Sequence, residues 1–204
     1  MTIAHVEFLV EEQSMEEAIR VLVPRLISNV TYGIYSHQGK HDLLRRLPDR
    51  LDAYARFLPP DWRIVVVVDR DDDDCHELKR RLNECATRAG LTTRTAVGGL
   101  SCQVVNRVAI EELEAWYFGD WQAVLCAYPR VPAGVPYRSG YRDSDAICGG
   151  TWEALERILR RSGYFSGGLR KVEAAQAIAT RMQPDRNSSA SFCAFRDAIR
   201  ELAQ

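Results

Sequence analysis

The feature that most constrains this chain is residues 64–68 (IVVVV), an unbroken run of β-branched side chains. Branching at Cβ favours extended backbone, and a strand without polar alternation is typical of a parallel sheet that helices cover on both faces. Asp69 follows the run directly. The run therefore predicts a central strand of an α/β sheet with an acidic side chain at its carboxyl end.

Strand and helix patterns alternate on either side of this run. We expect further strands at 5–10, 30–35, 92–97 and 103–110, and helices at 14–26, 43–54 and 78–89. Ser14 and Glu17 have the spacing of a capping box. Pro48 is expected to kink or divide the second helix, and Gly90 to end the third. This order predicts a Rossmann-like, doubly wound and mostly parallel sheet flanked by helices.

The second half of the chain has a different pattern. Residues 128–150 are rich in Pro and Gly and predict an irregular loop, and helices are expected at 151–162, 170–182 and 189–203. We therefore expect an α/β core over 1–125, with residues 126–204 forming a loop and C-terminal helices packed on that core. The 204 residues are expected to make a single structural domain.

Composition excludes several classes of protein. The net charge is -1, with 27 basic and 28 acidic side chains, so bulk charge gives no pull toward nucleic acid or membrane. No apolar stretch approaches the ~20 residues of a membrane span. The six cysteines form no C-x-x-C pair, and no secretory signal is evident. A cytoplasmic protein with reduced thiols is expected.

The strongest candidate site is the acidic run at 69–74 (DRDDDD). Ligands of open α/β sheets bind at the carboxyl ends of strands, and carboxylate oxygens suit Mg²⁺ or Mn²⁺. The spacing of Asp69 and Asp71 directs both side chains toward one site. The alternative is a solvated acidic loop that caps the next helix. Asp73 and Asp74 are assigned mainly to that capping role.

Glutamates elsewhere can complete this cluster. Glu11 ends the first predicted strand and becomes a third ligand if the two strands are neighbours, with Glu12 as its competitor, since only one of them can face the site. Glu111 and Glu114 are three residues apart and would share a helix face. They could extend the acidic site or hold a second metal. Alternatively, they form a solvent-exposed face with Trp116 packed beneath it.

Two basic segments are candidates for phosphate contact. Residues 167–171 (GGLRK) place Arg170 and Lys171 at the start of a helix, where a cation opposes the dipole and needs a reason to be there. The alternative is a loop with two exposed basic residues. Residues 186–192 (RNSSASF) could also bind phosphate oxygens, but an N-cap for the last helix is favoured.

Several motifs together resemble a known family. They are FLVEEQS, VVVVDRDDDDCHELK, IEELEAWYFGDW, GGLRKVEAA and RNSSASF. In this order they resemble the bacterial domain-of-unknown-function family 4276, which is similar to the Toprim domains of topoisomerases, primases and overcoming-lysogenization-defect nucleases. The resemblance implies a Toprim-type parallel sheet with catalytic acids at the positions of Glu11, Asp69 and Asp71. It also implies a role in phage defence by abortive infection, beside a co-encoded ATPase.

These observations lead us to expect a metal-dependent nuclease, a phosphodiesterase acting on DNA or RNA. The expected site residues are Glu11, Asp69, Asp71, Glu111, Glu114 and Lys171. The expected metal ligands are Glu11, Asp69, Asp71 and Glu114. Lys171 would stabilise phosphate charge. The alternatives are a non-catalytic, Toprim-like interaction module and a nucleotide transferase or synthase. The 128–150 loop, with its Tyr and Arg side chains, is the candidate docking surface for a partner ATPase. The alternative is a surface loop without a docking role.

Overall fold

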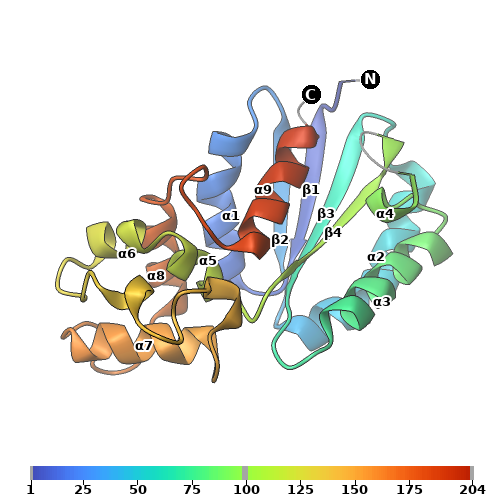
Figure 1. Ribbon diagram of the computed structural model, residues 1–204. Coiled ribbons are helices and arrows are strands. Elements are labelled where there is room, and N and C mark those ends of the chain that lie inside the picture. Colours follow the sequence, from blue (N-terminus) through green and yellow to red (C-terminus); the bar gives the residue numbers. More distant parts are fainter. Residues whose placement is uncertain (1, 98–100, 203–204) are drawn as a thin grey trace.

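The computed structural model describes residues 2–97 and 101–202, and a parallel sheet forms its centre. Within that part of the chain the strand order is β2-β1-β3-β4 (Figure 1). The strands are β1 (His5–Val10), β2 (Thr31–Ser36), β3 (Trp62–Asp69) and β4 (Val104–Ala109). The α/β fold and the central position of the IVVVV run are confirmed, because β3 has a strand on each side.

The strand order reverses between β1 and β3. The chain passes from β1 outward to β2, then returns to place β3 on the other side of β1. Such a switch point leaves a crevice outside the carboxyl ends of the two central strands, where open α/β sheets bind their ligands. Val10 pairs with Val67, so Glu11 lies beside the last residues of β3.

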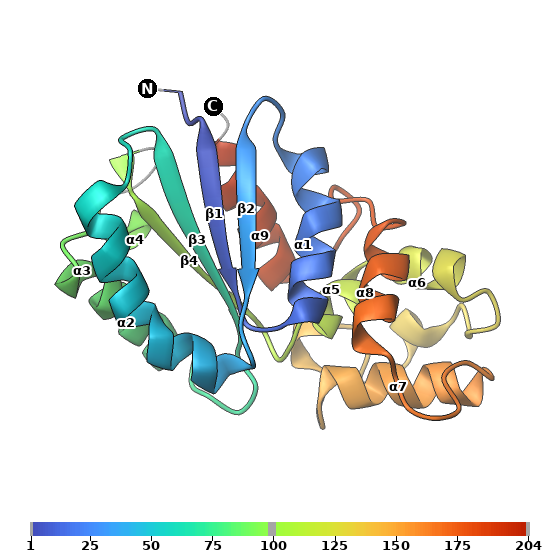
Figure 2. The same ribbon diagram turned by 180° about the vertical axis from the view of Figure 1, so that it is seen from behind.

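Helices cover both faces of the sheet. One face, with Leu9, Val66 and Val68, packs against α2 (Lys40–Phe57) and α3 (Cys75–Arg88). The other face, with side chains such as Phe8 and Val65, packs against α1 (Gln13–Leu26) and α9 (Ala190–Glu201). Figure 2 shows α2 and α3 on one side of the strands and α1 and α9 on the other. The alternate residues of each strand divide between these two cores, as the strand period of two requires.

The helices formed by residues 114–179 gather beyond α1, near the carboxyl edge of the sheet (Figure 1). They are α5 (Glu114–Gly119), α6 (Trp121–Ala127), α7 (Thr151–Arg161) and α8 (Lys171–Ala179), with short turns η2 (Val135–Tyr137) and η3 (Ser144–Ala146) in the loop between α6 and α7. Their buried side chains belong to the same hydrophobic cluster as those of α1. No helix among residues 2–97 and 101–202 combines the length and apolar character needed to cross a membrane.

Some predicted elements differ from the structure. Residues 92–97 form no strand: only Thr93 bridges to Val104 before the short helix α4 (Arg94–Val97) begins. The predicted capping box does not form. Helix α1 begins at Gln13, and the Ser14 hydroxyl donates to the Glu12 carboxylate. The helix that contains Pro48 runs unbroken. The C-terminal helices are confirmed, although residue 203 of the predicted last helix lies outside the described residues.

Candidate functional site

Glu11 and Asp69 meet at the switch point. Glu11 directly follows β1 and Asp69 is the last residue of the adjacent β3. The backbone N–H of Asp69 donates to Glu11 Oε2 at 3.0 Å, and the two residues are only 8% and 5% exposed. Burial raises the pKa of Glu11 to about 7, although the Asp69 amide opposes the rise. The strand pairing inferred from the sequence therefore does bring these two acids together.

The Asp69 carboxylate is the least compensated group of the site. Its Oδ1 atom is buried and has no hydrogen-bond partner within the described part of the chain. Burial, followed by repulsion from Glu11 and Glu114, raises the pKa of Asp69 well above its usual value. A buried carboxylate normally has a hydrogen-bonding or cationic partner. Asp69 therefore marks a position where a proton or a bound cation would relieve a large electrostatic cost.

Glu114 brings a third acid to this position. It is the first residue of α5 and is 3% exposed. Burial raises the pKa of Glu114 to about 7, while the charge of Lys171 acts in the opposite direction. Tyr117 follows one turn later with a buried hydroxyl that has no partner among the described residues. Sequence reasoning missed Tyr117, whose only signal was its place in the helix that Glu114 begins.

Glu111 does not share a helix face with Glu114, because α5 starts only at Glu114. Glu111 instead lies in the preceding loop with a positive φ of 57°, and its carboxylate pairs with Arg70. Asp71 also has a positive φ, 47°, and its N–H donates to Glu111 O at 2.8 Å. Left-handed backbone is costly for residues other than glycine and is concentrated at functional sites. The loops after β3 and β4 are therefore joined in one constrained arrangement.

Lys40, at the start of α2, is a site residue that the sequence did not reveal. Its Nζ lies 2.7 Å from Asp71 Oδ2 and 2.7 Å from Asp73 Oδ2, and it donates to the Arg70 carbonyl at 2.9 Å. Asp73 therefore binds a lysine rather than capping a helix. Asp74 does cap α3, accepting from Glu77 N at 2.8 Å. The only sequence signal for Lys40 was its position just after β2, the strand beside β1.

Lys171 lies near two other acids of this region, Glu12 and Glu114. It begins α8, and its Nζ lies 3.5 Å from Glu12 Oε1 and 5.1 Å from the centre of the Trp152 ring. Burial alone would lower the pKa of Lys171, but the carboxylates of Glu114 and Glu12 outweigh it and raise the value. Arg170 lies away from this group and pairs with Glu173 at 3.0 Å.

The 186–192 segment has a structural role. Ser189 caps α9 by accepting from Phe192 N at 3.1 Å, which confirms the favoured interpretation. Asn187 donates to Trp116 O at 2.7 Å, and a Cβ at Gly119 would lie 2.2 Å from Asn187 Oδ1. The close fit explains why glycine occupies position 119. The remaining polar groups of this segment bind neighbouring protein groups and do not contribute to the acidic site.

The site residues fit a hard cation only in part as they stand. Within the described residues, no three His, Cys, Asp or Glu side chains are grouped so as to hold a metal. Asp71 is engaged by Lys40, and Glu111 by Arg70. Asp69 and Glu114 form no such ion pair with any residue in the described part of the chain, and carboxylate oxygens are the ligands that Mg²⁺ and Mn²⁺ prefer. Small side-chain movements around Asp69 would be needed to form a complete ligand set.

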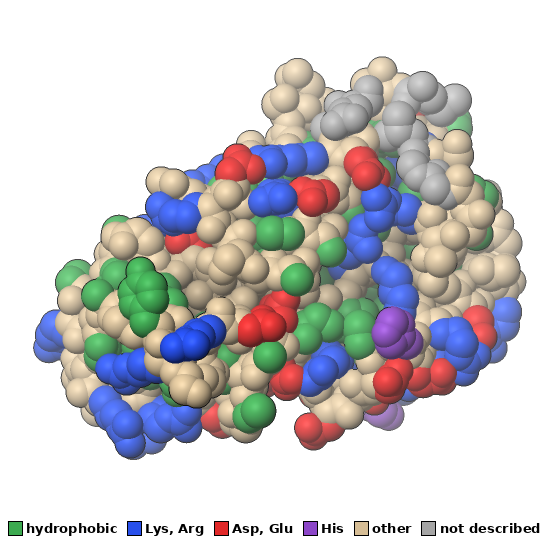
Figure 3. All heavy atoms as spheres, in the orientation of Figure 1, with side chains coloured by type: hydrophobic (Ala, Val, Ile, Leu, Met, Phe, Trp, Pro, Cys, Tyr) green, Lys and Arg blue, Asp and Glu red, His purple; other side chains and the backbone are tan. Residues whose placement is uncertain are grey.

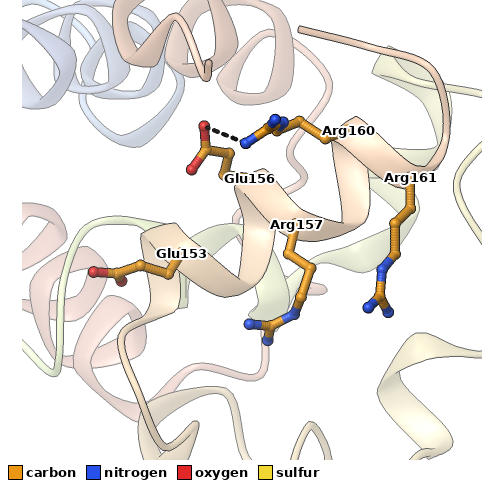
Figure 4. A pocket seen from close by; sticks show the side chains of 5 residues that line it. All are labelled: Glu153, Glu156, Arg157, Arg160 and Arg161. Carbon is orange, nitrogen blue, oxygen red and sulfur yellow. Dashed lines mark ion pairs between the residues drawn. The ribbon is translucent and has the colours of Figure 1, made fainter. Parts of the chain in front are cut away.

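A hollow in the surface of α7 lies apart from these acids. It has a volume of about 410 Å³ and is lined by Glu153, Glu156, Arg157, Arg160 and Arg161. Figure 4 shows side chains of both signs along one helix, with Glu156 directed toward Arg160. Glu156 also accepts from Leu169 N at 3.1 Å, so it supports the loop before α8. Mixed, largely solvated charges of this kind do not define a ligand site.

Comparison with known proteins places the chain in a family but does not identify an activity. The family model described as a domain of unknown function (DUF4276) matches residues 10–203. Neither the curated proteins nor the solved structures contain a match. The matched segment includes all of the acids described above and all the helices that surround them. The chain therefore belongs to the domain-of-unknown-function family DUF4276.

Proposed function

We propose that this protein is a metal-dependent phosphodiesterase of Toprim type that cleaves DNA or RNA. One observation carries the proposal: Glu11 and Asp69 are buried where the strand order reverses, the charge of buried Glu114 also acts on Asp69, and Asp69 Oδ1 has no partner among the described residues. A fold gains no stability by burying acids side by side, so their placement favours a functional cation.

Mg²⁺ or Mn²⁺ is the cofactor that these residues fit. Asp69, Glu11 and Glu114 would hold it, and Asp71 would join them after release from Lys40. A divalent ion in such a site polarises a phosphate and lowers the pKa of bound water. Glu111 forms an ion pair with Arg70, so it would position the loops and would not bind the metal ion directly.

The chain's own cations would act on the substrate. Lys171 is held beside Glu12 and over Trp152, which restricts the volume its ammonium can sample. A fixed ammonium near the acids can bind a phosphate oxygen and stabilise charge that develops there. Lys40 would hold the Asp71 carboxylate in an ion pair until a divalent cation displaces the ammonium. These roles would explain why Lys171 and Lys40 lie beside the acids.

A non-catalytic interaction module remains the second candidate. It is favoured by the ion pairs of Lys40 with Asp71 and of Arg70 with Glu111, which neutralise two acids without any metal. In that case the acidic crevice would serve as a binding surface only. The two candidates differ in a measurable way, because the module binds its partner without cleaving a phosphodiester.

An ATPase partner and a role in phage defence are also proposed, on the family resemblance. Fewer Tyr and Arg side chains of the 128–150 loop are available to contact a partner than the sequence suggests. Tyr128 is buried, and Arg130 lies 4.2 Å from the centre of the Tyr164 ring. Tyr137 is 81% exposed and is the better candidate contact. Binding of a co-encoded ATPase should therefore weaken in Tyr137→Ser.

Cleavage assays on single- and double-stranded DNA and RNA, with Mg²⁺ or Mn²⁺ and with or without the ATPase, test the proposal. We expect metal-dependent cleavage that Asp69→Asn abolishes. Asp72→Asn is the matched control, because Asp72 lies in the same acidic run but is exposed. Equal cleavage by both variants would reject the assignment. Absence of cleavage under every condition, with retained partner binding, would favour the interaction module.

A further inference from the structure

Basic side chains from three separate segments meet beside β4, the end strand of the sheet. Lys79 of α3 donates to the Asn106 carbonyl of β4. Burial and then the charge of Arg107 lower the pKa of Lys79 to about 8. Burial and then Arg94 lower the pKa of Arg107. Figure 3 shows Lys and Arg side chains in a column between α9 and the α3–α4 region, with acidic side chains near its lower end.

The positive charge of this group is only partly balanced. Arg94 forms a salt bridge with Glu201, with Nη2 and Oε2 separated by 2.6 Å. Within the described residues, Lys79 and Arg107 have no carboxylate partner, and Arg107 Nε is buried without a hydrogen bond. Recessed cations are normally paired. The charges of Glu201 and Asp197 oppose the lowering of the Arg107 pKa, but among the described residues neither carboxylate forms a salt bridge with Arg107. Two neighbouring cations without a salt bridge therefore indicate an anion that this surface binds.

A hollow of about 390 Å³ lies next to these cations. Its polar lining residues include His76, Lys79, Asn83, Thr93 and Thr95, together with the ion pair of Arg80 and Glu84. Their ammonium, amide, imidazole and hydroxyl groups are the donors that proteins use against phosphate oxygens. The lining therefore favours a phosphate-containing ligand.

The position of the group relates it to the acidic site. Asn106, whose carbonyl binds Lys79, is three residues before Ala109, which pairs with Asp69. At ~3.3 Å per residue, the cations lie about 10 Å along the strand from the acids. One nucleic-acid strand has a phosphate about every 3.4 Å of helix axis. A strand lying along β4 could therefore contact the cations while a phosphate about three nucleotides away reached Asp69.

We propose that Lys79, Arg107 and Arg94, which we call the basic cleft, bind the phosphate backbone of a single-stranded nucleic acid and direct it to the acids beside Asp69. The cations are recessed beside an edge strand and between helices, where one strand fits better than a duplex. The second half of this inference rests on the proposed function. Binding in the cleft does not, since it needs neither metal nor cleavage.

Binding of a labelled oligonucleotide of about 12 nucleotides, measured in EDTA over a range of salt concentrations, tests the cleft directly. Lys79→Gln and Arg107→Gln should each weaken binding several-fold and reduce the salt slope by about 0.7 for each phosphate that is no longer neutralised. The double variant should bind about tenfold more weakly, or weaker still. Arg81→Gln is the control: it removes the same charge from an exposed position on α3 outside the hollow. Melting temperatures would exclude unfolding as the cause.

The outcomes separate this proposal from the proposed function. Equal binding by Lys79→Gln, Arg107→Gln and Arg81→Gln would overturn the basic cleft, whatever the cleavage assays give. Pyrophosphate binding as tight as that of the oligonucleotide would also overturn it, in favour of a small-anion site. Tighter binding of duplex than of single strand would contradict the substrate class. Asp69→Asn should keep its affinity in EDTA even though it does not cleave.

Discussion

Asp69 is the residue on which the site depends, and its environment is unfavourable for folding. Its carboxylate is buried, has an oxygen without a partner in the described residues, and lies near the charges of Glu11 and Glu114. Functional acids are often kept at such a cost. Without a cation, the same group that would bind a metal should weaken the fold.

We therefore expect Asp69→Asn to stabilise the metal-free protein while abolishing cleavage. The amide keeps the shape of the side chain and removes the repulsion, so the free energy of unfolding should rise by about 1 kcal/mol at pH 7.5. Urea denaturation in EDTA measures this change, with Asp72→Asn as the control. A clear loss of stability in Asp69→Asn alone would identify Asp69 as a structural residue.

Lys171 gives a second prediction for a single residue. Lys171→Gln should reduce turnover by about tenfold or more, on the order of the effect of removing one charge-stabilising donor, and shift the melting temperature little. Among the described residues its ammonium forms one salt bridge, with Glu12 at 3.5 Å, and a single partly exposed pair contributes little to stability. Arg170→Gln, the control, removes a neighbouring cation that pairs away from the site. Full activity in Lys171→Gln would reject its phosphate role.

Among the helices, α5 begins with the buried acid that should make stability depend on pH. Glu114 has an unfolded pKa near 4.5 and a folded pKa of about 7. Because the folded value is higher, its stabilising contribution is complete below about pH 4.5 and is lost as pH rises through 7. Glu11, with a folded pKa of about 7, acts in the same direction.

The free energy of unfolding in EDTA should therefore fall between about pH 5 and pH 8. Glu114→Gln should flatten much of this fall and be more stable than the wild type at pH 8, by about 1–3 kcal/mol. Urea denaturation at several pH values gives the comparison. A parallel pH profile in the variant would show that Glu114 does not titrate in this range.

The elements also show what sequence patterns can predict. β3 is predictable because its continuous β-branched run favours a buried strand, and its pairing with β1 brings Glu11 and Asp69 together. The 92–97 prediction is wrong because its Thr and Val residues favour strands, whereas the chain pairs at Thr93 alone. The predicted helix face shared by Glu111 and Glu114 is wrong because α5 starts only at Glu114.

Lys40, Tyr117 and the basic cleft could not be predicted, because they depend on tertiary placement. Lys40 reaches Asp71 from the start of α2, and Tyr117 carries no motif. Lys79 and Arg107 are far apart in sequence and form no local basic run, and the near-neutral net charge gave no other sign of a basic surface. Local patterns locate acids at strand ends, but they do not locate the cations that meet them.

At the scale of the whole molecule, the C-terminal helices belong to the same core as the sheet. Met15 and Ile19 of α1 share one buried cluster with Ile178 of α8 and Phe192 of α9. Removing residues after 125 would expose that face of α1 and of the sheet. The fragment 1–125 should therefore lack a cooperative unfolding transition. Calorimetry of the fragment checks this, and a sharp transition would show that the α/β part folds alone.

The central claim is that the buried acids hold a divalent cation, and one measurement tests it most directly. Crystals soaked in Mn²⁺ should give an anomalous peak bounded by Asp69 and by Glu11 or Glu114, with oxygen ligands at about 2.1 Å. The same soak of Asp69→Asn should give no peak there. Crystals that bind no Mn²⁺ at these acids, with Asp71 still paired to Lys40 and Asp69 unchanged, would contradict the account.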